Sequence, residues 1–265
     1  MNGNNNPIGV FDSGIGGLTV LKELTLKLPF ENFIYVGDTA RVPYGTKSKE
    51  TITHYASQII EFLLSKNVKL IVVACNTVSS NSLNILKKKY KLPIIGVIEP
   101  GVKKAISITK NKRVGVIGTK ATINSHTYKK FLKKEKIKTF EKACPLFVPL
   151  VEEGWFDNEI TQLVAKEYLN DFKDKDIDTL ILGCTHYPML IPVIKRVLDN
   201  VNIINSAEAV SLETEEVLFK NKLLTNNKTK GKVEYYFTDL TELVLEISEK
   251  ILETPLQNVN KIFFP

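Results

Sequence analysis

The sequence predicts an α/β fold of two similar parallel-sheet domains, with helices on both faces of each sheet. Short apolar runs rich in β-branched residues alternate with longer segments whose apolar residues recur at helical spacing. This alternation is typical of parallel sheets covered by helices. The layout also occurs twice, and each copy ends in an apolar run, a small residue and a cysteine. The two cysteines, Cys75 and Cys184, are about one small domain apart.

The elements follow in order. In the first half we expect strands at 8–11, 32–38, 70–75 and 93–98, and in the second half at 113–119, 179–184 and 201–205. Helices are expected at 18–28 and 49–65, where leucines and other apolar residues share one face, and at 239–252. The polar segment 220–232 is expected to be an exposed loop or a fraying helix end.

These elements predict where the chain divides. A first domain of residues 1–98 plus 208–265 would include the C-terminal segment, which we expect to pack back on it. Residues 99–207 would form the second domain.

Composition excludes several classes of protein. The chain has 265 residues, 43% of them hydrophobic, and no apolar run of the roughly 20 residues that a membrane span needs. The N-terminus lacks a secretory signal, and three cysteines without a C-x-x-C pair indicate a reducing compartment. We therefore expect a cytoplasmic protein.

The net charge of +7 raises the question of a nucleic-acid partner. Lysines cluster at 87–91 and 128–138, but arginine is scarce and the same segments carry apolar residues at helical spacing. These runs are typical of the solvated faces of helices. We expect no nucleic-acid function.

Four unusual stretches stand at the carboxyl ends of predicted strands: DSGIGG (12–17), GDTARVPYG (37–45), CNT (75–77) and CTH (184–186). Parallel sheets bind ligands beyond the carboxyl ends of their strands, and the helix starts found there suit an anion. Two such half-sites that face each other could hold a small dicarboxylate between two thiols.

A carbon acid between two thiols predicts stereoinversion. One cysteine, as thiolate, removes the proton from one face, and the other, as thiol, returns a proton to the opposite face. A free thiol is only a few per cent ionised at neutral pH, so helper groups are needed. Asp12 is the candidate beside one cysteine, and His186 beside the other because histidine ionises near neutral pH.

Other readings of these residues exist. A cysteine after a buried strand is often a small packing residue, which is our expectation for Cys144. Zinc is disfavoured because Cys184 and His186 lack the usual ligand spacing, so no metal is expected. The glycine-rich turn could bind a dinucleotide, but Thr19 stands where the third glycine of that fingerprint belongs.

The motifs together resemble the glutamate racemases, within the cofactor-independent aspartate/glutamate racemase superfamily. The resemblance rests on FDSGIGGLTV, DTARVPYG, ACNTVS, IGVIEPG, CPLFVPLVEEG and LGCTHYP, which cover most of the chain from residue 8 to about 210.

This resemblance implies roles for particular residues. Cys75 would take the α-proton from D-glutamate and Cys184 from L-glutamate, assisted by Asp12 and His186. Glu152 would be a further acidic group on the Cys184 side, although Glu153 is adjacent. The residues implied to bind the substrate are Asp12, Ser13, Tyr44, Gly45, Asn76, Thr77, Thr185 and His186.

The resemblance also implies a site in the interdomain cleft, a homodimer, no cofactor, and the supply of D-glutamate for peptidoglycan. Asn205 stands where the family often has Asp. An aspartate or hydantoin racemase, or a non-catalytic two-lobed anion-binding protein, remains as the alternative. Ser13, Thr77 and Thr185 could instead cap helices, and Tyr44–Gly45 could be a simple turn.

Overall fold

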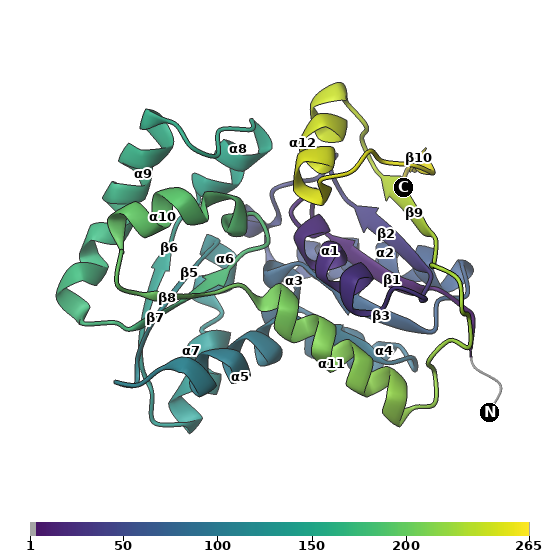
Figure 1. Ribbon diagram of the computed structural model, residues 1–265, viewed down its shortest axis with the longest axis horizontal. Coiled ribbons are helices and arrows are strands. Elements are labelled where there is room, and N and C mark those ends of the chain that lie inside the picture. The colour runs from purple at the N-terminus through teal and green to yellow at the C-terminus, as the bar shows by residue number, and fades with distance from the viewer. Residues whose placement is uncertain (1–3, 265) are drawn as a thin grey trace.

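A computed structural model describes residues 4–264 as two lobes, each built around a parallel sheet (Figure 1). The sheet of the first lobe runs in the order β10 (Val259–Lys261), β9 (Val233–Phe237), β2 (Phe33–Gly37), β1 (Ile8–Asp12), β3 (Leu70–Val73) and β4 (Ile94–Gly96). The sheet of the second lobe runs β6 (Lys138–Ala143), β5 (Arg113–Gly118), β7 (Thr179–Gly183) and β8 (Asn202–Ile204).

The two sheets repeat one strand order. β2-β1-β3-β4 in the first lobe corresponds to β6-β5-β7-β8 in the second, and all of these strands pair in parallel. The predicted fold class is therefore confirmed. Because β3 and β7 occupy the same place in the two sheets, the cysteines that follow them are equivalent by position.

Helices cover both faces of each sheet. The α-helices are α1 (Leu18–Lys27), α2 (Lys49–Ser65), α3 (Asn76–Asn81), α4 (Leu83–Lys89), α5 (Ile98–Ile108), α6 (Lys120–Asn124), α7 (Thr127–Lys134), α8 (Phe147–Glu152), α9 (Glu159–Leu169), α10 (Ile191–Val197), α11 (Ser206–Lys220) and α12 (Glu242–Leu252). Short 3₁₀ helices are η1 (Tyr44–Thr46), η2 (Asn170–Lys175) and η3 (Tyr187–Leu190). On the first sheet, α1, α11 and α12 pack on one face and α2 and α4 on the other. On the second, α8, α9 and α10 pack opposite α5 and α7.

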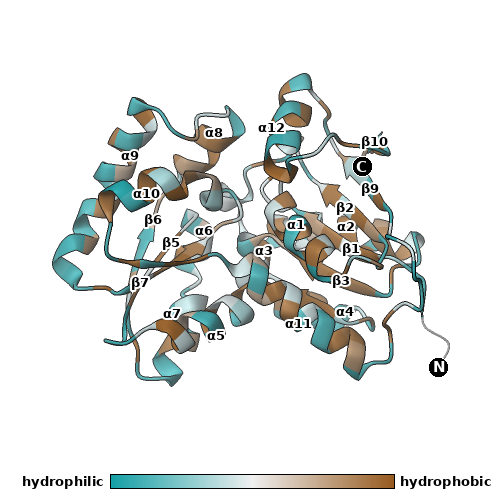
Figure 2. Cartoon of the chain, in the orientation of Figure 1, coloured by the Kyte–Doolittle hydropathy of each residue, from teal (hydrophilic) through white to brown (hydrophobic). Residues whose placement is uncertain are grey.

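The central strands are rich in apolar residues because both of their faces are buried. In β1, Ile8 and Val10 point into one core and Phe11 into the other. Figure 2 shows the same pattern, with hydrophobic colour on central strands such as β1, β2 and β3 and hydrophilic colour on the outer turns of the helices. Burial of these side chains is the main force that holds each lobe together.

The structure adds three strands that the sequence pattern did not predict. β6, β9 and β10 all lie at or near a sheet edge. Edge strands are half exposed, so the sequence of β6, KTFEKA, is mostly polar and contains no fully buried residue, instead of forming an apolar run. β9 and β10 extend the first sheet, whereas the exact domain boundaries near 98 and 208 stay a prediction.

The lysine-rich segments behave as solvated helix faces. On α7, Tyr128 and Leu132 are buried while the four lysines of the helix are exposed. Asn205 caps α11, because its Oδ1 accepts the Ala207 N–H over 3.1 Å. Across residues 4–264, no helix is long and apolar enough to span a membrane.

Candidate active site

The carboxyl edges of the two sheets face each other. In each sheet the strand order reverses at one point, which lies between β1 and β3 in the first sheet and between β5 and β7 in the second. Ligands of open α/β sheets bind outside such reversal points. Asp12 ends β1, Cys75 follows β3, Thr119 follows β5 and Cys184 follows β7. The Thr185 hydroxyl donates to Asp12 Oδ1 over 3.1 Å and joins the two edges.

A narrow pocket lies between these edges. Its lining residues are Ser13, Pro43, Tyr44, Gly45, Cys75, Asn76, Thr77, Thr119, Val148, Cys184, Thr185 and His186. Both thiols line it while remaining 4% and 6% exposed, respectively. Of the sequence-predicted residues, only Asp12 and Glu152 lie behind the lining, each in contact with a residue that forms it.

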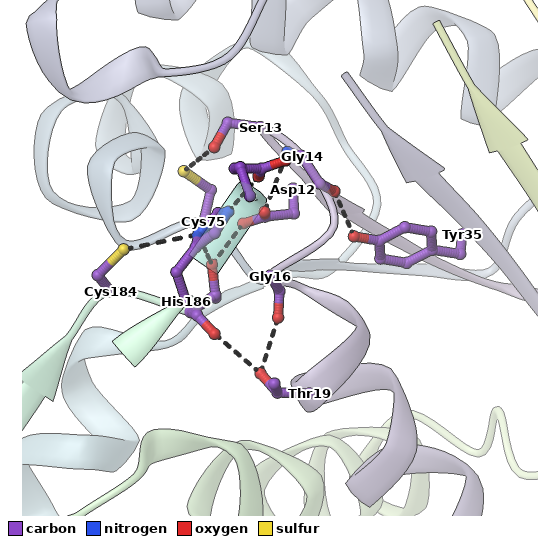
Figure 3. Close-up of polar contacts among 11 residues, drawn as sticks. Asp12, Ser13, Gly14, Gly16, Thr19, Tyr35, Cys75, Cys184 and His186 are labelled. Carbon is purple, nitrogen blue, oxygen red and sulfur yellow. Dashed lines mark hydrogen bonds and ion pairs between the residues drawn. The ribbon is translucent and has the colours of Figure 1, made fainter. Parts of the chain in front are cut away.

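Cys75 lies against the first lobe's glycine-rich turn. Its Sγ is 3.6 Å from the hydroxyl of Ser13 (Figure 3). Burial, and next the negative charge of Asp12, raise the pKa of the Cys75 thiol to about 12. In the free protein at neutral pH, Cys75 is therefore a protonated thiol, ready to donate.

Asp12 is a fully buried carboxylate held by donors from both lobes. Besides the hydroxyl of Thr185, its carboxylate accepts the Gly14 N–H over 3.1 Å. Burial raises the pKa of Asp12 above its usual range, and the charge of His186 opposes that shift. The Tyr35 hydroxyl donates to the Gly14 carbonyl over 2.7 Å and so holds the turn that carries Asp12 and Ser13.

Cys184 has a different partner. Its Sγ is 3.8 Å from Nδ1 of His186, whose Nε2 is 2.5 Å from Oε1 of Glu152 on α8. Burial by itself lowers the pKa of His186, but the contacts with Cys184 and Glu152 outweigh it and raise that pKa well above its usual value. An imidazolium therefore stands beside the Cys184 sulfur. Glu153 is exposed and Glu152 is the residue in contact.

The polar residues of the pocket are held across the lobe boundary. The Thr77 hydroxyl is 2.9 Å from that of Thr119, and Asn76 Oδ1 accepts the hydroxyl of Tyr128 over 2.6 Å. The capping alternative does not hold, because α1, α3 and η3 have no side-chain cap bond in the described chain.

Tyr44 and Gly45 begin the short helix η1 and form one wall of the pocket. The Tyr44 hydroxyl donates to the buried carboxylate of Asp38, which also accepts from Arg41 and Thr238. The carboxylate of Asp38 is thus bonded to three side chains of the protein itself.

Three residues at or near the pocket were not predicted from the sequence: Thr119, Tyr128 and Val148. Thr119 ends the predicted strand 113–119, just as Cys75 ends the predicted strand 70–75, so the same strand-end rule would also have found it. Tyr128 and Val148 sit on buried helix faces and look like ordinary core residues. No three His, Cys, Asp or Glu side chains cluster to hold a metal ion within residues 4–264.

Comparison with known proteins adds to this geometry. A family profile described as Asp/Glu/Hydantoin racemase matches residues 20–212. The chain belongs to this racemase family. The racemase is 45% identical over 258 residues to a glutamate racemase of Geobacter metallireducens, with 96% of each chain covered, and 51% identical over 233 residues to that of Persephonella marina, with 88% of each covered.

Solved structures resemble the whole racemase chain. The glutamate racemase of Francisella tularensis, determined with D-glutamate, is 43% identical, with a TM-score of 0.92 and 97% of each chain covered. An aspartate racemase of Picrophilus torridus, 19% identical with a TM-score of 0.57, shares the fold alone.

Proposed function

We propose that this racemase interconverts L- and D-glutamate by proton transfer at the α-carbon between Cys184 and Cys75. The observation that carries the proposal is that two positionally equivalent thiols, one from each sheet, line the same pocket. Proteins that share 45% or more of the sequence bear the name glutamate racemase.

The electrostatics of the two thiols set the first step. With imidazolium beside it, Cys184 acts as the thiolate that removes the α-proton of L-glutamate, and the electron pair of the C–H bond moves toward the α-carboxylate. Cys75, protonated because of its pKa of about 12, donates its proton to the opposite face and yields D-glutamate. The thiol and thiolate have then exchanged places, which suits the reverse reaction from D-glutamate.

The remaining residues bind and orient. Ser13, Asn76 and Thr77 supply hydroxyl and amide donors for the two carboxylates, Thr185 borders them while its hydroxyl donates to Asp12, and Gly45 leaves room beside them. Asp12 is placed to attract the substrate ammonium, whose positive charge would also lower the pKa of Cys75 on binding. Glu152 holds His186 in place. Since both thiols are nearly buried, the lobes must separate for glutamate to reach them.

We further propose a cytoplasmic location, a homodimer, and the supply of D-glutamate for peptidoglycan, all of which rest on the family. Sedimentation tests the oligomeric state. Depletion of the protein in its host tests the last point, because D-glutamate added to the medium should restore growth.

The activity is tested by incubating the protein with L-glutamate in heavy water without added cofactor. We expect optical rotation to be lost while deuterium enters the α-position. Cys75→Ala and Cys184→Ala should each abolish inversion, whereas Cys144→Ala, a thiol outside the pocket, should keep it.

Two outcomes would reject the proposal in different ways. Exchange with aspartate or a hydantoin but not with glutamate would retain the mechanism and change the substrate. Tight binding of glutamate that persists in Cys75→Ala, with no exchange by the wild type, would indicate the two-lobed binding protein.

A further inference from the structure

Tyr128 reaches from one lobe into the other. Its ring is fully buried in the second-lobe core between α7, α5 and the sheet, and its hydroxyl meets Asn76 at the start of α3 in the first lobe. A second bond joins the same helices, since the neighbouring Thr127 hydroxyl donates to the Ser80 carbonyl over 3.1 Å. α3 and α7 are therefore fixed to each other at this point.

The bond decides which end of the Asn76 amide faces the pocket. An asparagine side chain has one oxygen acceptor and one NH₂ donor at opposite corners. The Tyr128 hydroxyl donates to Asn76 Oδ1 over 2.6 Å, so the oxygen end of the amide is occupied and the NH₂ end is left for the pocket.

A carboxylate can only accept hydrogen bonds, so it needs the NH₂ end of Asn76. Were the amide turned over, its oxygen would face the substrate carboxylate and repel it. We propose that Tyr128 is a positioning residue that orients the Asn76 amide so that NH₂ points to a carboxylate of glutamate. The inference rests on the proposed function, and it adds a specificity element supplied by the opposite lobe.

The central test is Tyr128→Phe, which keeps the buried ring and removes only the hydroxyl. We expect KM to rise about five- to tenfold for both enantiomers, with kcat within about twofold, because the carboxylate is held equally in the ground and transition states. Tyr236→Phe is the matched control. Tyr236 is nearly buried, its hydroxyl bonds Glu234 over 2.8 Å, and it does not line the pocket.

A double-mutant cycle separates positioning from general damage. If Tyr128 acts through Asn76, Tyr128→Phe should raise KM in the wild type but leave it unchanged in an Asn76→Ala background. Equal increases in both backgrounds would overturn the inference, as would an unchanged KM in an active Tyr128→Phe enzyme. A wild type that does not racemise glutamate would instead refute the proposed function on which this inference rests.

A measurement on the wild type covers the case in which Tyr128→Phe does not fold. The side-chain amide of Asn76, assigned in an ¹⁵N spectrum by its loss in Asn76→Ala, should shift its N–H signals when D-glutamate saturates the site. Amide signals that stay unchanged at saturation would overturn the inference.

Discussion

A close approach between the lobes involves a glycine, and it makes a sharp prediction for Gly16→Ala. A Cβ on Gly16 would lie 2.5 Å from Nδ1 of His186 and 2.6 Å from the Thr185 hydroxyl. Ordinary contact begins at 3.4 Å, so His186 would have to move by about 0.9 Å. Both residues belong to the other lobe, and both line the pocket.

The magnitude follows from that displacement. His186 Nδ1 is the atom next to the Cys184 sulfur, and a shift of about 1 Å in a catalytic group costs roughly 100-fold in rate, or about 2.7 kcal/mol of transition-state stabilisation. The lobes can move apart slightly instead of unfolding, so the free energy of unfolding should fall by only about 1–3 kcal/mol, as in ordinary overpacking.

The assay is the initial rate of racemisation followed by circular dichroism, together with urea unfolding of the same samples. Gly9→Ala is the control, because its Cβ would meet the flexible end of Leu63 at 3.0 Å and Cγ1 of Val68 at 3.3 Å, both outside the pocket. It should retain nearly full activity. A Gly16→Ala enzyme with wild-type kcat/KM would refute the inference that the turn presses on His186 in the active state.

Three other perturbations have defined outcomes. Glu152→Gln removes the charge that helps raise the pKa of His186, so the alkaline limb of the kcat/KM profile should move down by about one pH unit. The ion pair of His186 and Glu152 contributes its full stability below pH 6.5, the ordinary pKa of histidine, and this contribution fades as the pH rises through the raised pKa of His186. The loss of unfolding free energy in Glu152→Gln, measured by urea unfolding, should therefore be largest below pH 6.5. Lys69→Met leaves the buried carboxylate of Glu31 unpaired at the opposite end of the first sheet and should cost about 3–5 kcal/mol of unfolding free energy, with KM unchanged. Asn205→Asp keeps the cap of α11 and should alter KM by less than about twofold in the racemisation assay.

The sequence by itself determined the fold class, the doubled layout and the identity of the two thiols. Buried parallel strands must be apolar on both faces, and that requirement leaves a pattern that needs no knowledge of distant contacts. Strand ends then mark where polar residues meet a ligand, which is why Cys75, Cys184, Asp12 and His186 could be singled out.

Only the tertiary structure decided which groups touch across the lobes. Glu152 rather than Glu153 reaches His186 because α8 turns that residue inward, and nothing in two adjacent glutamates shows which one does so. From the sequence, Tyr128 looks like an ordinary core tyrosine, and only the structure shows that its hydroxyl donates to Asn76 of the other lobe. The edge strand β6 was not predicted because most of its residues are polar. Side-chain contacts between distant segments depend on how the two lobes pack. The periodic pattern of one segment does not show which other segment packs against it.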